Sequence, residues 1–97
     1  MIKYSLKALE DLAQLKADLM DQDPVFSLVK ITSLVDQIGQ IDFERLEDFK
    51  VFQASGHTYY YKIFQDQIVF LRLINGQVFI DRIFHKDLDF VTLALDL

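Results

Sequence analysis

The dipeptide Asn75-Gly76 lies between two runs rich in aromatic and β-branched residues, Gln67–Ile74 and Gln77–Phe84. Asparagine and glycine both tolerate the positive φ angles that a two-residue hairpin turn requires. A third run of the same kind, His57–Phe64, precedes them and is separated from the second by two polar residues. The sequence therefore predicts a three-stranded antiparallel meander over the second half of the chain.

A two-residue turn fixes which side chains share a face of that meander, because directly paired residues point to the same side. The turn pairs Arg72 with Phe79, and a second two-residue turn at 65–66 places Tyr59 opposite Arg72. One face is then nearly all aliphatic and is expected to meet the helices; it comprises Val69, Leu71, Leu73, Val78, Ile80, Arg82 and Phe84. The other, open face comprises Ile68, Phe70, Arg72, Ile74, Phe79, Asp81, Ile83 and His85, joined by Tyr59, Tyr61 and Ile63.

The open face is too apolar for a solvated surface and too polar for a core, which is typical of a face that binds a partner or a substrate. Two alternatives stay open: the chain's own apolar segment at 90–95 covers this face, or the face is catalytic. Proton transfer at neutral pH suits a histidine, whose unperturbed pKa is about 6.5. The catalytic candidates are His85, Arg72 and Tyr59, and the candidates for partner binding are Tyr61, Phe70, Phe79 and Arg82.

Several of these candidates also have a simpler structural interpretation. Arg72 and Asp81 are placed to form a cross-strand ion pair. His85, at the end of its strand, would bond a nearby carboxylate such as Asp87. Arg82 is the odd residue on the helix-facing side, where its stem would be buried while its head reaches an acidic residue of the helices.

The first half of the chain has helical periodicity over about 6–20 and again over 25–38. Ser5 suits the N-cap of the first helix, and Asp23-Pro24 ends it and starts the second. Both apolar sets are expected to face the core. They comprise Leu6, Leu9, Leu12, Ala13, Leu15 and Leu19 in the first helix and Val25, Leu28, Val29, Ile31, Leu34, Val35 and Ile38 in the second.

These elements combine into a predicted α+β fold. A short strand at Ile2–Tyr4 is followed by an antiparallel helix hairpin, packed on one face of an antiparallel sheet of three to four strands. Residues 40–56 fit neither period and are predicted to form a turn of helix followed by extended chain. A chain of 97 residues leaves room for one core, so residues 1–97 are expected to form a single domain.

Charge and composition narrow the function classes. The formal net charge is −5, and the acidic excess lies in the first half, which disfavours direct nucleic-acid binding through counterion release. The chain contains no cysteine and two histidines, so neither a metal site nor a cofactor is expected. It contains neither a signal-peptide pattern nor an apolar stretch of membrane-spanning length, so we expect no membrane association and a cytoplasmic location.

The segment Arg82–His85, followed by Asp89, resembles the Arg-Ile/Val-x-His-x-x-x-Asp pattern that ends the sheet in the RelE/ParE family of bacterial toxins. The segment Ala8–Leu12 is similar to the A-x-x-D-L pattern with which the helix hairpin of that family opens. The order and spacing of the predicted elements also agree along most of the chain. The resemblance implies a RelE/ParE-like fold, and a toxin that a cognate antitoxin wraps and silences.

The resemblance implies one of two actions. RelE-like members cut messenger RNA on the ribosome with side chains on the open sheet face, whereas ParE-like members poison DNA gyrase without such a set. The Arg82–His85 ending looks more ParE-like. This chain departs from the family in its acidic charge, and Tyr59–Tyr61 occupies the place of a family arginine, so its catalytic set for RNA cleavage is incomplete.

We therefore expect the toxin component of a bacterial type II toxin–antitoxin system, inhibiting growth by a gyrase-type or weakened RelE-type action. Its expected partners are an antitoxin and, as target, gyrase or the ribosome. The alternatives are a non-enzymatic protein-interaction domain that shares the topology, and a ribosome-dependent mRNA endonuclease.

Overall fold

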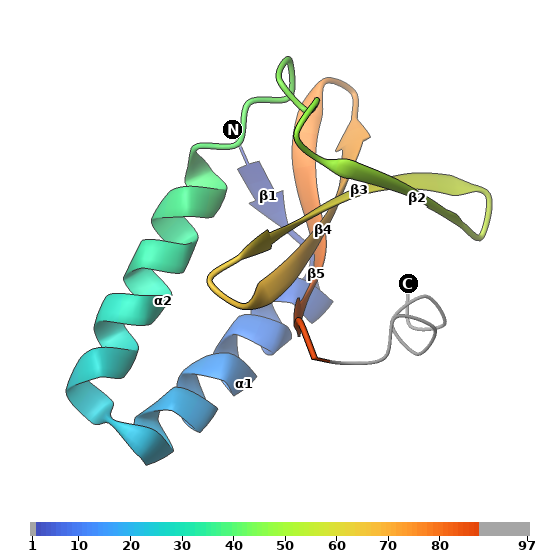
Figure 1. Ribbon diagram of the computed structural model, residues 1–97. Helices are drawn as coiled ribbons and strands as arrows, with labels where there is room; N and C mark the ends of the chain where they lie inside the picture. The colour runs from blue at the N-terminus through green and yellow to red at the C-terminus, as the bar shows by residue number, and fades with distance from the viewer. Residues whose placement is uncertain (1, 88–97) are drawn as a thin grey trace.

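The computed structural model describes residues 2–87 and folds them into two helices lying against one side of a sheet (Figure 1). The elements in chain order are β1 (Ile2–Tyr4), α1 (Leu6–Gln22), α2 (Pro24–Gly39), β2 (Lys50–Ala54), β3 (His57–Phe64), β4 (Gln67–Ile74) and β5 (Gln77–His85). The predicted α+β class, the short N-terminal strand and the helix hairpin are confirmed. The expected segment at 90–95 lies outside the described residues.

The helix boundaries follow from the caps that the sequence supplies. The Ser5 hydroxyl accepts a hydrogen bond of 3.0 Å from the Ala8 N–H and donates one of 2.7 Å to the Asp81 carbonyl, which ties the start of α1 to β5. Asp23 both ends α1 and caps α2, because its carboxylate accepts from the first free N–H groups of α2 at 3.1 Å. Pro24 occupies the first turn, where no donor is needed.

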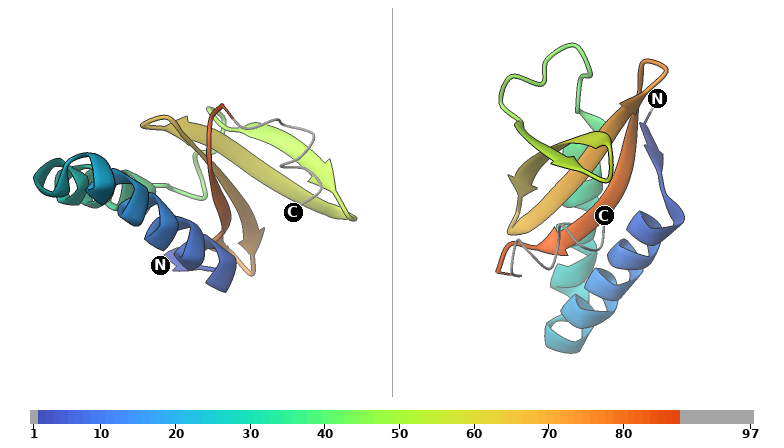
Figure 2. Two further views of the ribbon diagram at one scale, coloured as in Figure 1. Left: turned by 90° about the horizontal axis from the view of Figure 1, so that it is seen from below. Right: turned by 90° about the vertical axis from the view of Figure 1, so that its right-hand side faces the viewer.

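The sheet is larger than expected and is mixed. Its five strands run in the order β1-β5-β4-β3-β2, with β1 parallel to β5 and every other neighbouring pair antiparallel. The expected sheet of three to four antiparallel strands lacks β2, because the sequence predicts only extended chain there; β2 forms a hairpin with β3. Figure 2 shows that the β2–β3 ribbon twists away from the helices.

All three hairpins turn through two residues with positive φ, as expected for the second and third. At Asn75 and Gly76 the φ angles are 52° and 76°. The predicted pairing around this turn is confirmed, including Arg72 opposite Phe79. The turn at 65–66 also behaves as predicted and places Tyr61 opposite Phe70.

A β-bulge in β5 overturns part of the predicted register. Leu71 pairs with Ile80, but Phe70 pairs with Arg82, so Asp81 is an extra residue on β5. Because side chains alternate, one inserted residue reverses the facing of everything beyond it. The residues whose predicted faces were therefore wrong are Arg82, Ile83, Phe84 and His85.

The sheet carries a core on each side. Toward the helices lies a cluster of Ala8, Leu34, Ile38, Val69, Leu71, Val78, Ile80 and Ile83. On the open side lies a second cluster, which we call the open-side cluster, consisting of Tyr59, Ile68, Phe70 and Phe84. The centre of the open face is therefore buried, since Phe70 is fully buried and Tyr59 is 4% exposed, whereas Ile63 at its margin is 55% exposed.

The predicted helix cores were only half right. Leu34 and Ile38 in α2 are buried as expected, whereas the buried residue of α1 is Ala8, which was not in the predicted set. Other members of the predicted sets face solvent, and Leu6 and Val25 are 73% and 79% exposed. Each helix carries two apolar stripes, and a single sheet can bury only one of them.

Candidate functional site

Arg72 and Asp81 form the ion pair that the sequence predicted. The Arg72 Nε donates to both carboxylate oxygens of Asp81 at 2.9 and 3.1 Å, and Nη2 donates to Oδ1 at 2.8 Å. The guanidinium carbon lies 5.6 Å from the ring centroid of Tyr59 and 5.9 Å from that of Phe79. The hydrogen bond to Asp81 raises the pKa of Arg72, while burial opposes this rise. The charge of the Arg72 guanidinium is thus neutralised by Asp81.

Arg82 reaches Asp11 of α1, as expected for its head group. Its Nε and Nη2 donate to the two carboxylate oxygens at 2.9 and 3.1 Å, and its guanidinium carbon lies 4.3 Å from the ring centroid of Phe84. The same carboxylate accepts the backbone N–H of Ile83 at 2.9 Å. Strand β1 pairs with β5 only as far as Ile80. The Ile83 N–H lies beyond this pairing on the same edge of β5, and the Asp11 carboxylate accepts its hydrogen bond.

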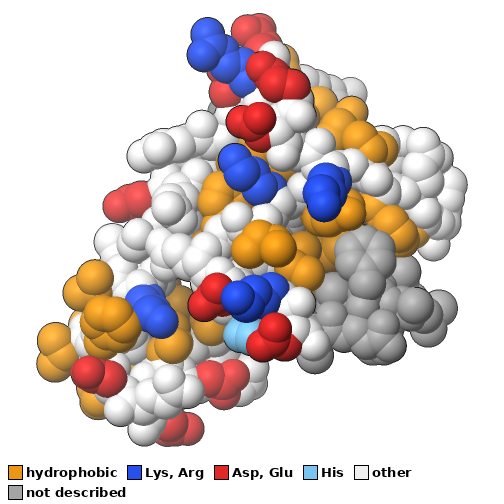
Figure 3. Space-filling model, viewed as in Figure 1, with side chains coloured by type: hydrophobic (Ala, Val, Ile, Leu, Met, Phe, Trp, Pro, Cys, Tyr) orange, Lys and Arg blue, Asp and Glu red, His pale blue; other side chains and the backbone are white. Residues whose placement is uncertain are grey.

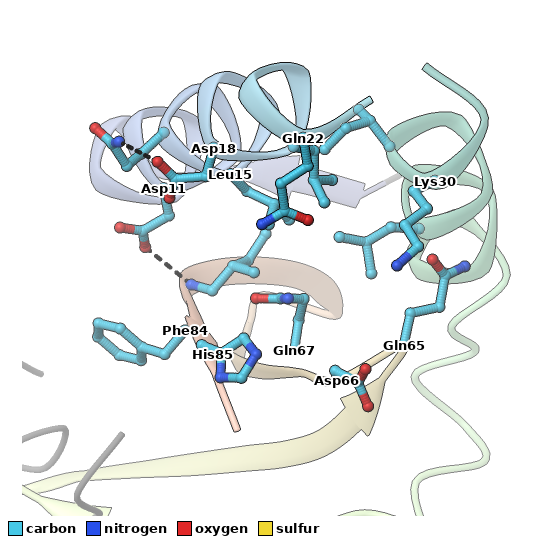
Figure 4. A pocket seen from close by; sticks show the side chains of 15 residues that line it. Asp11, Leu15, Asp18, Gln22, Lys30, Gln65, Asp66, Gln67, Phe84 and His85 are labelled. Atoms are coloured by element: carbon cyan, nitrogen blue, oxygen red, sulfur yellow. Dashed lines mark hydrogen bonds between the residues drawn. The ribbon is translucent and has the colours of Figure 1, made fainter. Parts of the chain in front are cut away.

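His85 does not join Arg72 and Tyr59. The bulge pairs it with Gln67, and it lines a cavity on the helix side together with that residue and Ile83 (Figure 4). Its Nδ1 accepts from the Asp87 N–H at 3.2 Å and lies 3.5 Å from a carboxylate oxygen of Asp87. The predicted contact with Asp87 is confirmed. The predicted grouping of an imidazole with a guanidinium and phenols on one face is wrong.

The cavity that His85 lines has a volume of about 530 Å³ and lies between both helices and the adjoining ends of β4 and β5. Its polar lining mixes both charges, with Asp18 and Lys30 on the helices and Gln65 on the β3–β4 turn (Figure 4). Within residues 2–87, no group of three or more His, Asp or Glu side chains is placed to hold a metal ion. Neither helix described here is long and apolar enough to cross a membrane.

The predicted partner-binding residues divide by burial. Tyr61 and Phe79 are partly exposed, whereas Phe70 is enclosed by aromatic rings of three other strands. A residue without exposed surface makes no direct contact with a partner protein. The rings of Phe52 on β2 and Tyr61 on β3 lie 6.4 and 5.4 Å from the ring of Phe70.

The most exposed apolar surface was missed by sequence reasoning. It lies on the outer sides of the helices, and Figure 3 shows hydrophobic side chains gathered over α2. We call this surface the helical stripe; it comprises Leu6, Leu9 and Met20 of α1 and Val25, Leu28, Val29 and Val35 of α2. The signal was present in the spacing, because Val25 lies nine residues before the buried Leu34 and nine residues at about 100° each end on the opposite side of a helix.

An exposed ion pair fixes the end of β5 to the β3–β4 turn. Lys86 Nζ lies 3.0 Å from the Asp66 carboxylate, and the Lys86 N–H donates to the Asp66 carbonyl at 2.9 Å. The hydrogen bond from Lys86 lowers the pKa of Asp66, and the same bond raises the pKa of Lys86.

This pair predicts a pH effect with a defined sign. A carboxyl whose pKa is lower in the folded state stabilises the fold above its unfolded value, about 3.9, and loses that contribution as pH falls through the folded value. We expect an NMR titration to place the pKa of Asp66 below the ordinary range for an aspartate. In Lys86→Met the pKa of Asp66 should rise back into that range. Lys62→Met is the matched control and should leave it unchanged. An unaltered Asp66 titration in Lys86→Met would contradict the assignment.

The chain has structural neighbours among solved proteins. No protein-family model matches it, and no curated protein does. Two solved structures similar to it are those of YafQ from E. coli and of a YafQ mutant, at 16% and 17% sequence identity and a TM-score of 0.48 each. Each alignment covers 89% of this chain and 92% of the other.

Proposed function

We propose that this protein is the toxin of a type II toxin–antitoxin pair, and that it inhibits growth by binding a protein target, in the manner of the gyrase-directed members of the RelE/ParE family. The proposal rests on the resemblance at Arg82–His85 and Ala8–Leu12, together with a helix hairpin between a parallel edge strand and an antiparallel meander.

The observation that carries the protein-directed action is the helical stripe. Its side chains lie on two adjacent antiparallel helices, and Val29 and Leu28 are 60% and 56% exposed. Apolar surface gathered in this way is typical of sites that bind another protein. A target such as gyrase would bury this surface, and the antitoxin would compete for it or for the neighbouring sheet.

Three features favour protein binding over RNA cleavage. Cleavage needs a fixed cation to stabilise the extra negative charge on phosphorus, and the Arg72 guanidinium is already paired with Asp81. A general acid or base must act beside that cation, and His85 lies on the other side of the sheet. The net charge of −5 also repels a phosphate backbone.

The test is inducible expression of the chain alone in bacteria. We expect growth to stop after induction, and co-expression of the adjacent short reading frame, where the gene has one, to restore it. The double variant Val25→Asp with Leu28→Asp should permit normal growth at equal protein levels, because two charges on the helical stripe oppose apolar docking.

The matched control is Val51→Asp on β2. Val51 is 57% exposed, nearly the same as Leu28, so the control adds a charge at equal exposure but away from the helices. It should still arrest growth. Normal growth with the unaltered chain would instead favour the non-enzymatic interaction domain. Arrest that persists in the double variant would remove the helical stripe from the action.

A further inference from the structure

Gln67, the first residue of β4, carries a buried carboxamide that the protein does not satisfy. The residue is 8% exposed, and within residues 2–87 its side chain forms no hydrogen bond. Ser27, the other buried polar residue of that range, donates its hydroxyl to the Pro24 carbonyl at 2.9 Å. A buried amide without a protein partner costs free energy unless another molecule satisfies it, so such groups are rare in folded proteins.

The Gln67 carboxamide borders the cavity of about 530 Å³ between the two helices and the sheet. In the described part of the chain, every side-chain N or O atom that is fully enclosed has a hydrogen-bond partner, so the unbonded amide atoms of Gln67 reach open space. Figure 4 shows this side chain rising from β4 toward α1. The amide is therefore placed to bind a group inside the cavity.

The walls around this amide are largely aliphatic. They are formed by side chains of α1, α2 and β5, namely Leu15, Leu19, Ile31, Leu34 and Ile83. Sites for small organic molecules have volumes of about 300–1,000 Å³, mostly apolar walls and a few fixed polar groups. The cavity has the size and the lining of such a site.

The three described carboxylates that line the cavity have partners in the protein. The Arg82 guanidinium binds the Asp11 carboxylate at 2.9 Å, and the Lys86 ammonium lies 3.0 Å from that of Asp66. The third carboxylate, of Asp18, accepts a hydrogen bond of 2.9 Å from a glutamine one turn earlier in α1. The lining therefore does not select for a cationic ligand.

The two basic side chains of the lining are also engaged. The Lys30 Nζ lies 5.1 Å from the ring centroid of Phe26, and the His85 Nδ1 accepts from the Asp87 N–H at 3.2 Å. The His85 side chain is 51% exposed, and Lys30 is exposed as well, so water and salt screen their charges. Among the polar groups considered, the neutral amide of Gln67 is thus the buried one that is left for a ligand.

We propose that this cavity binds a small uncharged molecule that carries a primary carboxamide or a lactam on an apolar body. In both groups an N–H and a C=O lie on the same side, so they pair with the C=O and the NH₂ of Gln67 through two adjacent hydrogen bonds. The trans peptide group of an extended chain points its N–H and C=O in opposite directions and offers one of the two. The inference does not depend on the proposed function.

The first test is an NMR titration of the isotope-labelled chain with isovaleramide, a primary amide on a branched apolar body. We expect the signals of the Gln67 NH₂ group and of the Ile31 and Ile83 methyl groups to shift, with a dissociation constant on the order of millimolar. The matched probes are isovalerate and methyl isovalerate, which have the same apolar body but no N–H donor. They should bind at least about tenfold more weakly.

The second test replaces the amide itself. Gln67→Met keeps the length of the side chain and removes both polar atoms, so isovaleramide should bind at least about tenfold more weakly. The thermal unfolding midpoint without ligand should rise by about 4–8 °C, because an unsatisfied buried group is removed. The control is Gln53→Met at an exposed position of β2, which should alter neither quantity.

Four results would overturn the proposal. They are no shift of any cavity signal with isovaleramide, equal binding of isovalerate or its methyl ester, unchanged binding in Gln67→Met, and a lower unfolding midpoint in Gln67→Met. The last would show that the amide serves the fold rather than a ligand. The comparison of the three probes needs no variant, so it decides the question even where Gln67→Met folds poorly.

Discussion

Replacing Phe70 with alanine is expected to lower the free energy of unfolding by about 3–5 kcal/mol. Phe70 is fully buried at the centre of β4 and contacts rings from three other strands. The substitution removes the apolar area of the ring and leaves a cavity that the surrounding aromatic residues fill only in part. Denaturant unfolding followed by circular dichroism measures the loss.

The matched control for Phe70→Ala is Phe43→Ala. Phe43 is 44% exposed and lies in the connection between α2 and β2, so the same atoms are removed from a site that water already reaches. Its cost should stay below about 1 kcal/mol. Equal costs for the two variants would show that the open-side cluster does not act as a core.

Asp11→Ala is expected to cost about 2–3 kcal/mol, below the value of about 3–5 kcal/mol for breaking a fully buried ion pair. The carboxylate accepts hydrogen bonds from the Arg82 side chain and from the Ile83 N–H, and the paired side chains of Asp11 and Arg82 keep 16% and 17% of their surface exposed. The variant leaves the edge of β5 without this acceptor. Hydrogen exchange at Ile83 should therefore accelerate in step with the loss of stability.

Asp18→Ala is the control for Asp11→Ala on the same helix. Asp18 accepts a hydrogen bond of 2.9 Å from the Gln14 side chain at an exposed position. Exposed contacts of this kind contribute little, so the change should stay within about 0.5 kcal/mol. An equally small effect of Asp11→Ala would mean that α1 is held to the sheet by apolar packing alone.

Local signals in the sequence were sufficient for the turns and caps. Asn75 and Gly76 specified their hairpin through backbone conformation, and Ser5 and Asp23 specified the helix starts through hydrogen bonds to nearby N–H groups. Each signal acts within a few residues. Strand β2 was missed because its pairing with β3 depends on contacts across the hairpin rather than on its own alternation.

The bulge at Asp81 could not be inferred from local sequence. It contains no glycine and interrupts no alternation, and the contact that accompanies it is the hydrogen bond from the Ser5 hydroxyl to the Asp81 carbonyl, 76 residues apart. The ion pair with Arg72 was predictable because it needs only the register close to the turn. The position of His85 was not, since every residue after the bulge changes face.

The exposure of the helical stripe could not be predicted from the sequence, for a different reason. Apolar spacing identified both helices, but it could not say which of two apolar sides the sheet would bury. Leu34 and Val35 are adjacent in sequence and equally apolar, yet one is buried and the other is 38% exposed. The choice depends on how the hairpin sits on the sheet, which is a tertiary property.

Incubating the purified chain with ribosomes carrying a defined message tests most directly whether its action depends on protein binding or on RNA cleavage. We predict that the message stays intact, because Arg72 is paired with Asp81 and His85 lies across the sheet from it. Cleavage by the unaltered chain that disappears in both Arg72→Ala and His85→Ala would contradict this account.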